Sequence, residues 1–146
     1  MAATTDPNTI LIMDDELFNI QWLIDFLMSK GYDIIPTSSA DEAIKAVSEQ
    51  VYRAAILDLN VPMEGVPTVG SLRDKTVYQK YPGLYVAWHA RNKGYRDRQV
   101  IIYTVHRDPE VAREASIIGC TYILKGRPVE LKEEINHVLS FDPTAQ

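Results

Sequence analysis

The sequence is poor in the features that mark secreted, membrane-spanning and nucleic-acid-binding proteins. Its 146 residues include one cysteine, Cys120, so no disulfide framework is expected. No apolar run approaches the roughly 20 residues that a membrane-spanning helix needs. The net charge is -5, which argues against nucleic-acid binding through phosphate contacts. The chain starts with small and polar residues rather than a signal peptide, so we expect a protein of the reducing cytoplasm.

The remaining composition is that of an ordinary globular domain. Hydrophobic residues make up 46% of the chain and charged residues 24%. A chain of 146 residues is long enough to bury one sizeable core. We expect a single domain over residues 1–146, with its core at 9–139, an insertion at 66–82 and a tail at 140–146.

Short apolar segments that fit strands alternate along the chain with segments of helical period. The expected strands are Thr9–Met13, Tyr32–Pro36, Tyr52–Leu59, Gln99–Tyr103 and Thr121–Leu124. Helices are expected at Leu17–Ser29, from a cap at Ser39 through Val47, at Leu84–Lys93, from a cap at Asp108 to Gly119, and at Val129–Leu139. This alternation predicts a doubly wound α/β fold, with helices on both faces of a five-stranded parallel sheet.

Polar residues stand at the ends of four of the five expected strands. Asp14 and Asp15 follow the first strand, Asp58 lies at the end of the third, Thr104 follows the fourth and Lys125 follows the fifth. Ligand sites of open α/β sheets lie outside the carboxyl ends of the strands. We therefore expect these five side chains to meet at one edge of the sheet.

This ordered set resembles the receiver domains of two-component response regulators, of the chemotaxis-regulator type. Asn60 and Pro62 are similar to the loop that follows the phosphorylated aspartate in that family, and Tyr122 is similar to its switch aromatic. The resemblance covers roughly Thr9–Leu139 apart from the insertion. It implies the flavodoxin-like strand order 2-1-3-4-5.

The resemblance also implies a function. The chain would be a regulatory phosphoacceptor rather than an enzyme, with Asp58 as the phosphorylated nucleophile and Lys125 and Thr104 binding the phosphoryl group. The donor would be a sensor histidine kinase or a histidine phosphotransfer protein, and a downstream protein would be the target. Thr104 and Tyr122 would switch the face made by the fourth helix, the fifth strand and the fifth helix. A homodimer is a further expectation; direct contact with nucleic acid or a membrane is not expected.

The acidic residues also point to a divalent cation by their chemistry. Asp14, Asp15 and Asp58 would place three negative charges in one small site, which raises some carboxyl pKa values unless a cation joins them. Hard carboxylate oxygens suit Mg²⁺, and three carboxylates, one divalent cation and Lys125 sum to zero charge. By resemblance, Asp15 and Asp58 would bind Mg²⁺ directly with the main-chain carbonyl of Asn60, and Asp14 would act through water.

Two features depart from the receiver pattern. The family usually has proline directly after the lysine, whereas Gly126 follows Lys125 here. The second departure is Val66–Pro82, which has no clear period and lies close to Asp58 in the fold we expect. It is locally basic, with Arg73, Lys75 and Lys80, and it carries Tyr78 and Tyr81, of a residue type that serves well at interfaces. We expect it to tune partner access; an inert solvated loop is the alternative.

Other functions for the same residues stay open. A receiver-like binding module that is not switched by phosphate is the main alternative. An aspartate-nucleophile phosphatase of the haloacid-dehalogenase type fits less well, because its nucleophile precedes its metal-binding acid pair. In this chain the pair precedes Asp58, and Asn60 stands where that class has a second aspartate.

Several conspicuous side chains are expected to have only structural roles. Trp22 and Trp88 lie in helical segments and are expected to pack helices, while Cys120 is expected to be a small packing residue. His106 is expected to be a surface histidine, although its place two residues after Thr104 would also let it influence water access to a phosphoryl group.

Overall fold

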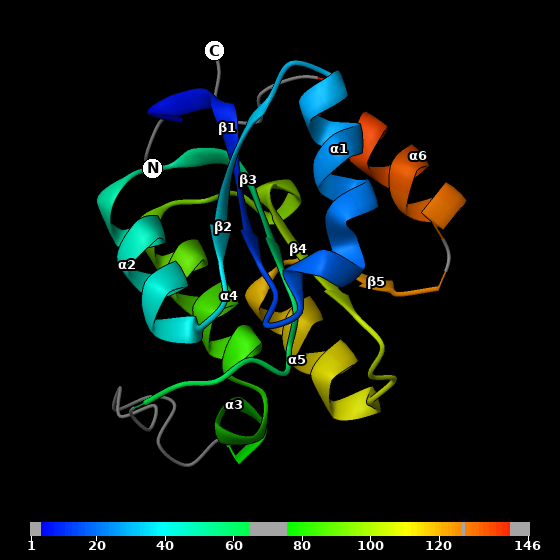
Figure 1. Cartoon of the computed structure of the whole chain (residues 1–146). Coiled ribbons are helices and arrows are strands. Elements are labelled where there is room, and N and C mark those ends of the chain that lie inside the picture. The colour runs from blue at the N-terminus through cyan, green and yellow to red at the C-terminus, as the bar shows by residue number, and fades with distance from the viewer. Residues whose placement is uncertain (1–3, 65–75, 127, 141–146) are drawn as a thin grey trace.

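The computed structural model describes residues 4–64, 76–126 and 128–140, and its centre is a sheet of five parallel strands (Figure 1). The strands are β1 (Asp6–Met13), β2 (Asp33–Thr37), β3 (Tyr52–Leu57), β4 (Val100–Thr104) and β5 (Thr121–Leu124). Their order is β2-β1-β3-β4-β5, and every neighbouring pair is parallel. The predicted fold class and strand order are therefore confirmed.

Helices cover both faces of the sheet, as Figure 1 shows. One face carries α1 (Gln21–Ser29), which follows a 3₁₀ turn η1 (Leu17–Ile20), and α6 (Pro128–Val138). The other face carries α2 (Ala40–Glu49), α4 (Pro82–Lys93) and α5 (Pro109–Ile118). Two shorter elements are α3 (Thr76–Lys80) and η2 (Asp97–Gln99). Among the described residues, no helix combines the length and apolar character that crossing a membrane would need.

The apolar run of β1 explains why the sheet is buried on both sides. Successive side chains of a strand point to opposite faces, so a strand covered on both faces needs a continuous apolar sequence. Ile10 and Ile12 pack into the core under α1 and α6, whereas Leu11 and Met13 pack into the core under α2 and α4. All four side chains are at most 1% exposed. The polar residues that follow such a run emerge at the end of the sheet.

The predicted helix starts at Ser39 and Asp108 are confirmed by their hydrogen bonds. The Ser39 hydroxyl accepts the Glu42 N–H at 3.2 Å, and the Glu42 carboxylate in turn accepts the Ser38 N–H at 3.1 Å. Asp108 Oδ1 accepts the Glu110 N–H at 2.9 Å. The contacts to Glu42 and Glu110 satisfy N–H groups that the first turn of a helix leaves without a partner, and the contact to Ser38 fixes the residue before the cap.

The end of the expected insertion differs from the prediction. Thr76–Lys80 forms the helix α3, and α4 begins at Pro82 rather than Leu84. Tyr78 is 1% exposed and Tyr81 is 7% exposed, so the expectation that they serve an exposed interface is wrong. Both rings belong to the hydrophobic core between the sheet and α4. The Tyr78 hydroxyl donates to Glu114 on α5 at 3.1 Å. The remainder of the insertion, residues 66–75 with Arg73 and Lys75, lies outside the described residues.

Gly83, in the first turn of α4, makes the tightest backbone contact in this region. Its N–H donates to the carbonyl oxygen of Leu59 at 2.9 Å. A Cβ atom at this position would lie 1.9 Å from the Asp58 carbonyl oxygen and 2.7 Å from Leu59 Cα. The absence of a side chain at Gly83 therefore lets α4 start directly against the end of β3.

Gly83→Ala should destabilise the protein even though alanine is the better helix former. The intrinsic helix preference favours alanine by about 1 kcal/mol. The added Cβ meets backbone atoms that cannot rotate away, and overpacking of this kind costs roughly 1–3 kcal/mol or more. We expect a net loss in the free energy of urea unfolding, with Lys93→Ala on the exposed surface of α4 as the control. A Gly83→Ala variant as stable as the parent would show that α4 can shift away from β3 at little cost.

Candidate functional site

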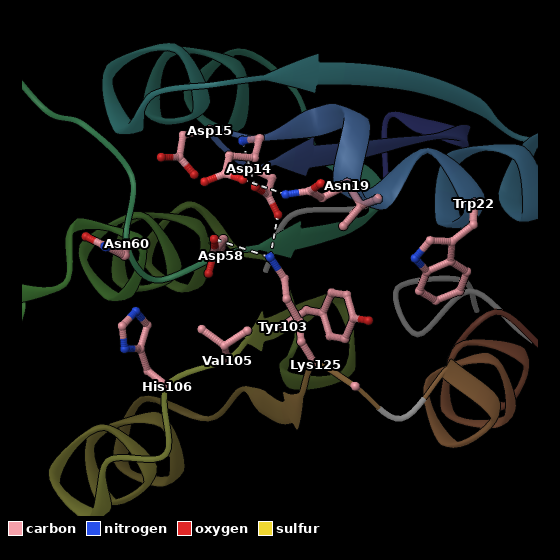
Figure 2. Close-up of a pocket in the computed structure, with 13 residues that line it drawn as sticks. Asp14, Asp15, Asn19, Trp22, Asp58, Asn60, Tyr103, Val105, His106 and Lys125 are labelled. Atoms are coloured by element: carbon pink, nitrogen blue, oxygen red, sulfur yellow. Dashed lines mark hydrogen bonds and ion pairs between the residues drawn. The ribbon is translucent and has the colours of Figure 1, made fainter.

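The carboxyl ends of β1 and β3 bring three aspartates together, as Figure 2 shows. One carboxylate oxygen each from Asp14, Asp15 and Asp58 can be chosen so that all lie within 4.8 Å of one another. Asp14 is 2% exposed and Asp58 is 9% exposed, whereas Asp15 is open to solvent. The site is therefore a largely buried pair of acids with a third acid at its mouth.

Backbone hydrogen bonds between neighbouring strand ends fix where the two buried acids lie. The Asp14 N–H donates to Thr37 O at 3.0 Å, and the Asp58 N–H donates to Met13 O at 2.9 Å. Each carboxylate is held as well, because Asp14 Oδ1 accepts the Glu16 N–H at 2.9 Å and Asp58 Oδ1 accepts the Leu59 N–H at 2.8 Å. These contacts hold one oxygen of each acid, Oδ1, and Oδ2 of each interacts with Lys125.

Lys125, at the end of β5, supplies the positive charge of the site. Its Nζ lies 2.6 Å from Asp14 Oδ2 and 3.4 Å from Asp58 Oδ2. The Lys125 N–H donates to the Thr104 carbonyl oxygen at 2.7 Å, which extends the pairing of β4 and β5 by one residue. Gly126 has φ of 96°, a conformation that favours glycine, so the chain turns away immediately after the lysine. That turn occupies the place where the receiver family usually has proline.

Thr104, the last residue of β4, is fully buried next to Asp58. Its hydroxyl oxygen accepts the N–H of His106 at 3.3 Å and also interacts with the Asp58 carboxylate. Asn60, which follows Asp58 closely in the chain, is exposed and lines the same pocket. The structure thus brings together Asp14, Asp15, Asp58, Asn60, Thr104 and Lys125, all of which the sequence indicated.

Burial and charge act in opposite directions on Asp58. Desolvation raises the pKa of its carboxyl group, Lys125 lowers it, Asp14 raises it, and the net direction is upward. For Lys125, burial alone would lower the pKa, but contacts with Asp14 and Asp58 raise it above its ordinary value. Both directions have one cause: two largely buried carboxylates share a single ammonium group. The two negative charges favour the charged form of Lys125, whereas one positive charge does not offset the cost of burying the Asp58 carboxylate.

The pocket around these residues has a volume of about 380 Å³ and extends beyond the acids. Tyr103 and Trp22 line its other end, and neither was identified from the sequence as part of a site. The Lys125 ammonium lies 5.6 Å from the centre of the Tyr103 ring, within range of a cation–π contact. Trp22 also packs under Lys132 of α6, so it has the expected packing role and lines the pocket as well. Trp22 is on α1 and Tyr103 is on β4, so their meeting at one pocket depends on how helix and strand pack, and local sequence pattern carries no signal for that.

The loop between β4 and α5 borders the pocket. His106 is half-buried and lines the pocket, which corrects the expectation of a purely surface histidine. The Tyr122 hydroxyl donates to the His106 carbonyl oxygen. The residue expected to act as a switch aromatic therefore holds the loop that begins at Thr104. Its role in switching stays a prediction.

Solved structures similar to this chain are receiver domains and response regulators. A CheY-like response regulator receiver domain from Methanospirillum hungatei JF-1 has a TM-score of 0.70 and 20% identity, over 92% of this chain and 95% of the other. A two-component response regulator from Clostridium difficile has a TM-score of 0.69 and 20% identity, over 91% and 96%. The BeF3-activated receiver domain of Klebsiella pneumoniae RstA has a TM-score of 0.69 and 15% identity, over 92% and 100%.

The resemblance to receiver domains is thus confirmed at the level of the fold. No protein-family model matches the sequence, and no curated protein matches it. What the chain shares with these structures is the arrangement of its strands and helices. Its chemistry must be argued from its own residues.

Asp58→Asn should stabilise the metal-free protein at neutral pH, by roughly 0.5–2 kcal/mol if the gain is in the usual range for stabilising substitutions. The folded-state pKa of Asp58 lies above its usual value of 3.8, so ionisation of this group opposes folding. The opposing effect is absent below the unfolded pKa and is complete once the pH has risen through the folded pKa. Urea unfolding between pH 7 and pH 4 should therefore show a gain that shrinks as the pH falls.

Asp33→Asn is the control for this measurement. Asp33 is an exposed aspartate at the start of β2, at the opposite end of the sheet from the site. Its replacement changes net charge by the same amount without touching the cluster. Equal stabilities of the Asp58→Asn variant and the parent at pH 7 would mean that Lys125 fully compensates the buried carboxylate.

Proposed function

We propose that this chain is the phosphoacceptor domain of a two-component system and that Asp58 receives a phosphoryl group from a phosphohistidine. The observation that carries the proposal is the setting of Asp58: a nearly buried carboxylate within 3.4 Å of the Lys125 ammonium and grouped with two further aspartates. The receiver fold supports the same role.

The proposed reaction is an in-line transfer to a carboxylate oxygen of Asp58. The O–P bond forms as the P–N bond of the donor breaks, and the imidazole nitrogen leaves with the electron pair of that bond. The Lys125 ammonium and the buried Thr104 hydroxyl are held next to Asp58, where they would donate hydrogen bonds to the phosphoryl oxygens. Positioning and electrostatic stabilisation of this kind dominate phosphoryl transfer. The protein would be a regulatory acceptor, acting only on its own phosphorylation state.

The donor atoms of the site fit Mg²⁺. All three clustered side chains offer hard carboxylate oxygens, the ligands that Mg²⁺ prefers together with water. Asp15, Asp58 and the main-chain carbonyl of Asn60 would hold the ion, and Asp14 would act through water. When bound, the ion would neutralise charge that builds up on the transferred group.

The proposed output surface is the face formed by α5, β5 and α6. Thr104 would hydrogen-bond the phosphoryl group, and Tyr122 would reorient as the loop that it holds moves. This surface would contact a downstream protein or a second copy of the chain. The donor would be a sensor histidine kinase or a histidine phosphotransfer protein, and this chain would receive the phosphoryl group in the cytoplasm. In the main alternative, a binding module, the same face would bind its partner without any change at Asp58.

Incubation with Mg²⁺ and a small phosphodonor should add one phosphoryl group to the protein. Intact mass measurement should detect the adduct in the parent and in Asp33→Asn, and it should be lost in Asp58→Asn because the nucleophilic oxygen is gone. Omission of Mg²⁺ should slow labelling strongly. A parent protein that stays unlabelled would support the binding module, and a labelled Asp58→Asn variant would move the acceptor elsewhere.

Asp15→Ala should weaken Mg²⁺ binding roughly tenfold or more, because the ion loses a charged ligand. Trp22 lines the pocket, so its fluorescence can report binding in a Trp88→Phe background that leaves it as the sole tryptophan. Asp33→Ala removes the same charge far from the site and should leave the affinity unchanged. Equal affinities for the Asp15→Ala variant and the parent would remove Asp15 from the ligand set.

A further inference from the structure

Tyr81 lies at the corner between α3 and α4, and this corner contacts the candidate site on two sides. On one side, Gly83 donates its N–H to Leu59 O at 2.9 Å and lies directly against the Asp58 carbonyl. Figure 1 shows α3 at the same edge of the molecule as the carboxyl ends of the strands. The corner is therefore fixed to the backbone of the proposed phosphoacceptor.

On the other side, the Tyr81 side chain contacts the β4–α5 loop, residues 105–108. Its ring lies against the imidazole of His106, with the ring centres 5.4 Å apart. Its hydroxyl donates to Asp108 Oδ2 at 3.2 Å. Asp108 Oδ1 meanwhile accepts the Glu110 N–H as the cap of α5. One carboxylate thus joins the start of α5 to the α3 corner.

Hydrogen bonds from three directions contribute to holding the β4–α5 loop. The His106 N–H donates to the Thr104 hydroxyl at its start, and the Tyr122 hydroxyl donates to the His106 carbonyl from β5. The Tyr81 hydroxyl holds its other end through Asp108. Because Thr104 contributes both to this loop and to the Asp58 environment, a shift of Thr104 toward a phosphoryl group would strain these contacts.

We propose that Tyr81 is a positioning residue that holds the β4–α5 loop in its unphosphorylated arrangement, so that the α3 corner is coupled to the state of Asp58. The inference rests on the proposed function of Asp58. It adds a role for Tyr81, which lies in the segment that the sequence indicates as an insertion and contacts the β4–α5 loop. A hydrogen bond made in only one of two conformations shifts their equilibrium by its own free energy. Release of the Tyr81 contact should therefore favour the phosphorylated arrangement.

Tyr81→Phe is the direct test, because it removes the hydroxyl and keeps the ring against His106. Hydrogen exchange of the His106 and Glu110 amides should become faster in the ligand-free variant, since both report on this loop. Binding of beryllofluoride with Mg²⁺, a phosphoryl mimic, should become roughly threefold to tenfold tighter. Tyr85→Phe is the matched control: Tyr85 is 6% exposed, and no described residue hydrogen-bonds its hydroxyl.

Asp108→Asn separates the hydrogen bond from general packing. Asparagine still caps α5 through its single side-chain oxygen, which places the amide nitrogen, a donor, where Asp108 Oδ2 accepts from Tyr81. The hydrogen bond from the Tyr81 hydroxyl to a charged carboxylate is therefore lost. This variant should shift beryllofluoride affinity in the same direction as Tyr81→Phe, and the two effects should not add in the double variant.

The outcomes distinguish the positioning role from the proposed function. If the parent binds beryllofluoride and Tyr81→Phe leaves either loop exchange or affinity unchanged, or weakens binding, the role of Tyr81 is overturned and the function of Asp58 stands. If the parent fails to bind the mimic, the proposed function fails. The coupling to Asp58 then fails with it, and loop exchange tests only whether Tyr81 holds the loop: faster exchange in Tyr81→Phe supports that contact, and unchanged exchange overturns it as well.

Discussion

The contact of one ammonium with two largely buried carboxylates is the constraint around which the site is organised. Lys125 reaches Asp14 at 2.6 Å and Asp58 at 3.4 Å, and a third acid, Asp15, lies at the mouth. Burial raises the pKa of Asp58 because a single lysine cannot offset the desolvation of both acids. The strand ends nevertheless keep these groups in place, because each buried acid is tied into the backbone of its neighbouring strand. The site therefore favours ligands that bring positive charge or replace lost hydration.

The hydrophobic core limits how far the strand ends that carry these acids can move. The apolar runs of β1 and β3 are buried on both faces, which leaves little freedom for their ends to shift. On the α4 side, Gly83 lets a helix start directly against the Asp58 backbone. A rigid floor matters for phosphoryl transfer, because the protein contributes mainly by holding donor and acceptor atoms in position.

The segment that looked like an accessory loop is partly built into this arrangement. Tyr78 donates to Glu114 on α5, and Tyr81 donates to Asp108 at the cap of the same helix. The α3 corner thus bridges β3 and α5, the two elements between which a signal from Asp58 would pass. A fold shared with receiver domains supplies the edge of the sheet, and in this chain the α3 corner packs against that edge.

The sequence by itself determined the alternation of strands and helices and the chemistry at the strand ends. Five apolar runs and the caps at Ser39 and Asp108 are local signals, because burial on both faces and N-terminal capping act within a few residues. Tertiary structure alone decided the roles of Tyr78, Tyr81, Tyr103 and Trp22. Their partners lie on other elements: Tyr81 and Asp108 are 27 residues apart, and Tyr78 and Glu114 are 36 apart. With only five residues, α3 is too short for a period to show, and whether a tyrosine serves a surface or a core depends on which hydroxyl acceptor the fold brings beside it.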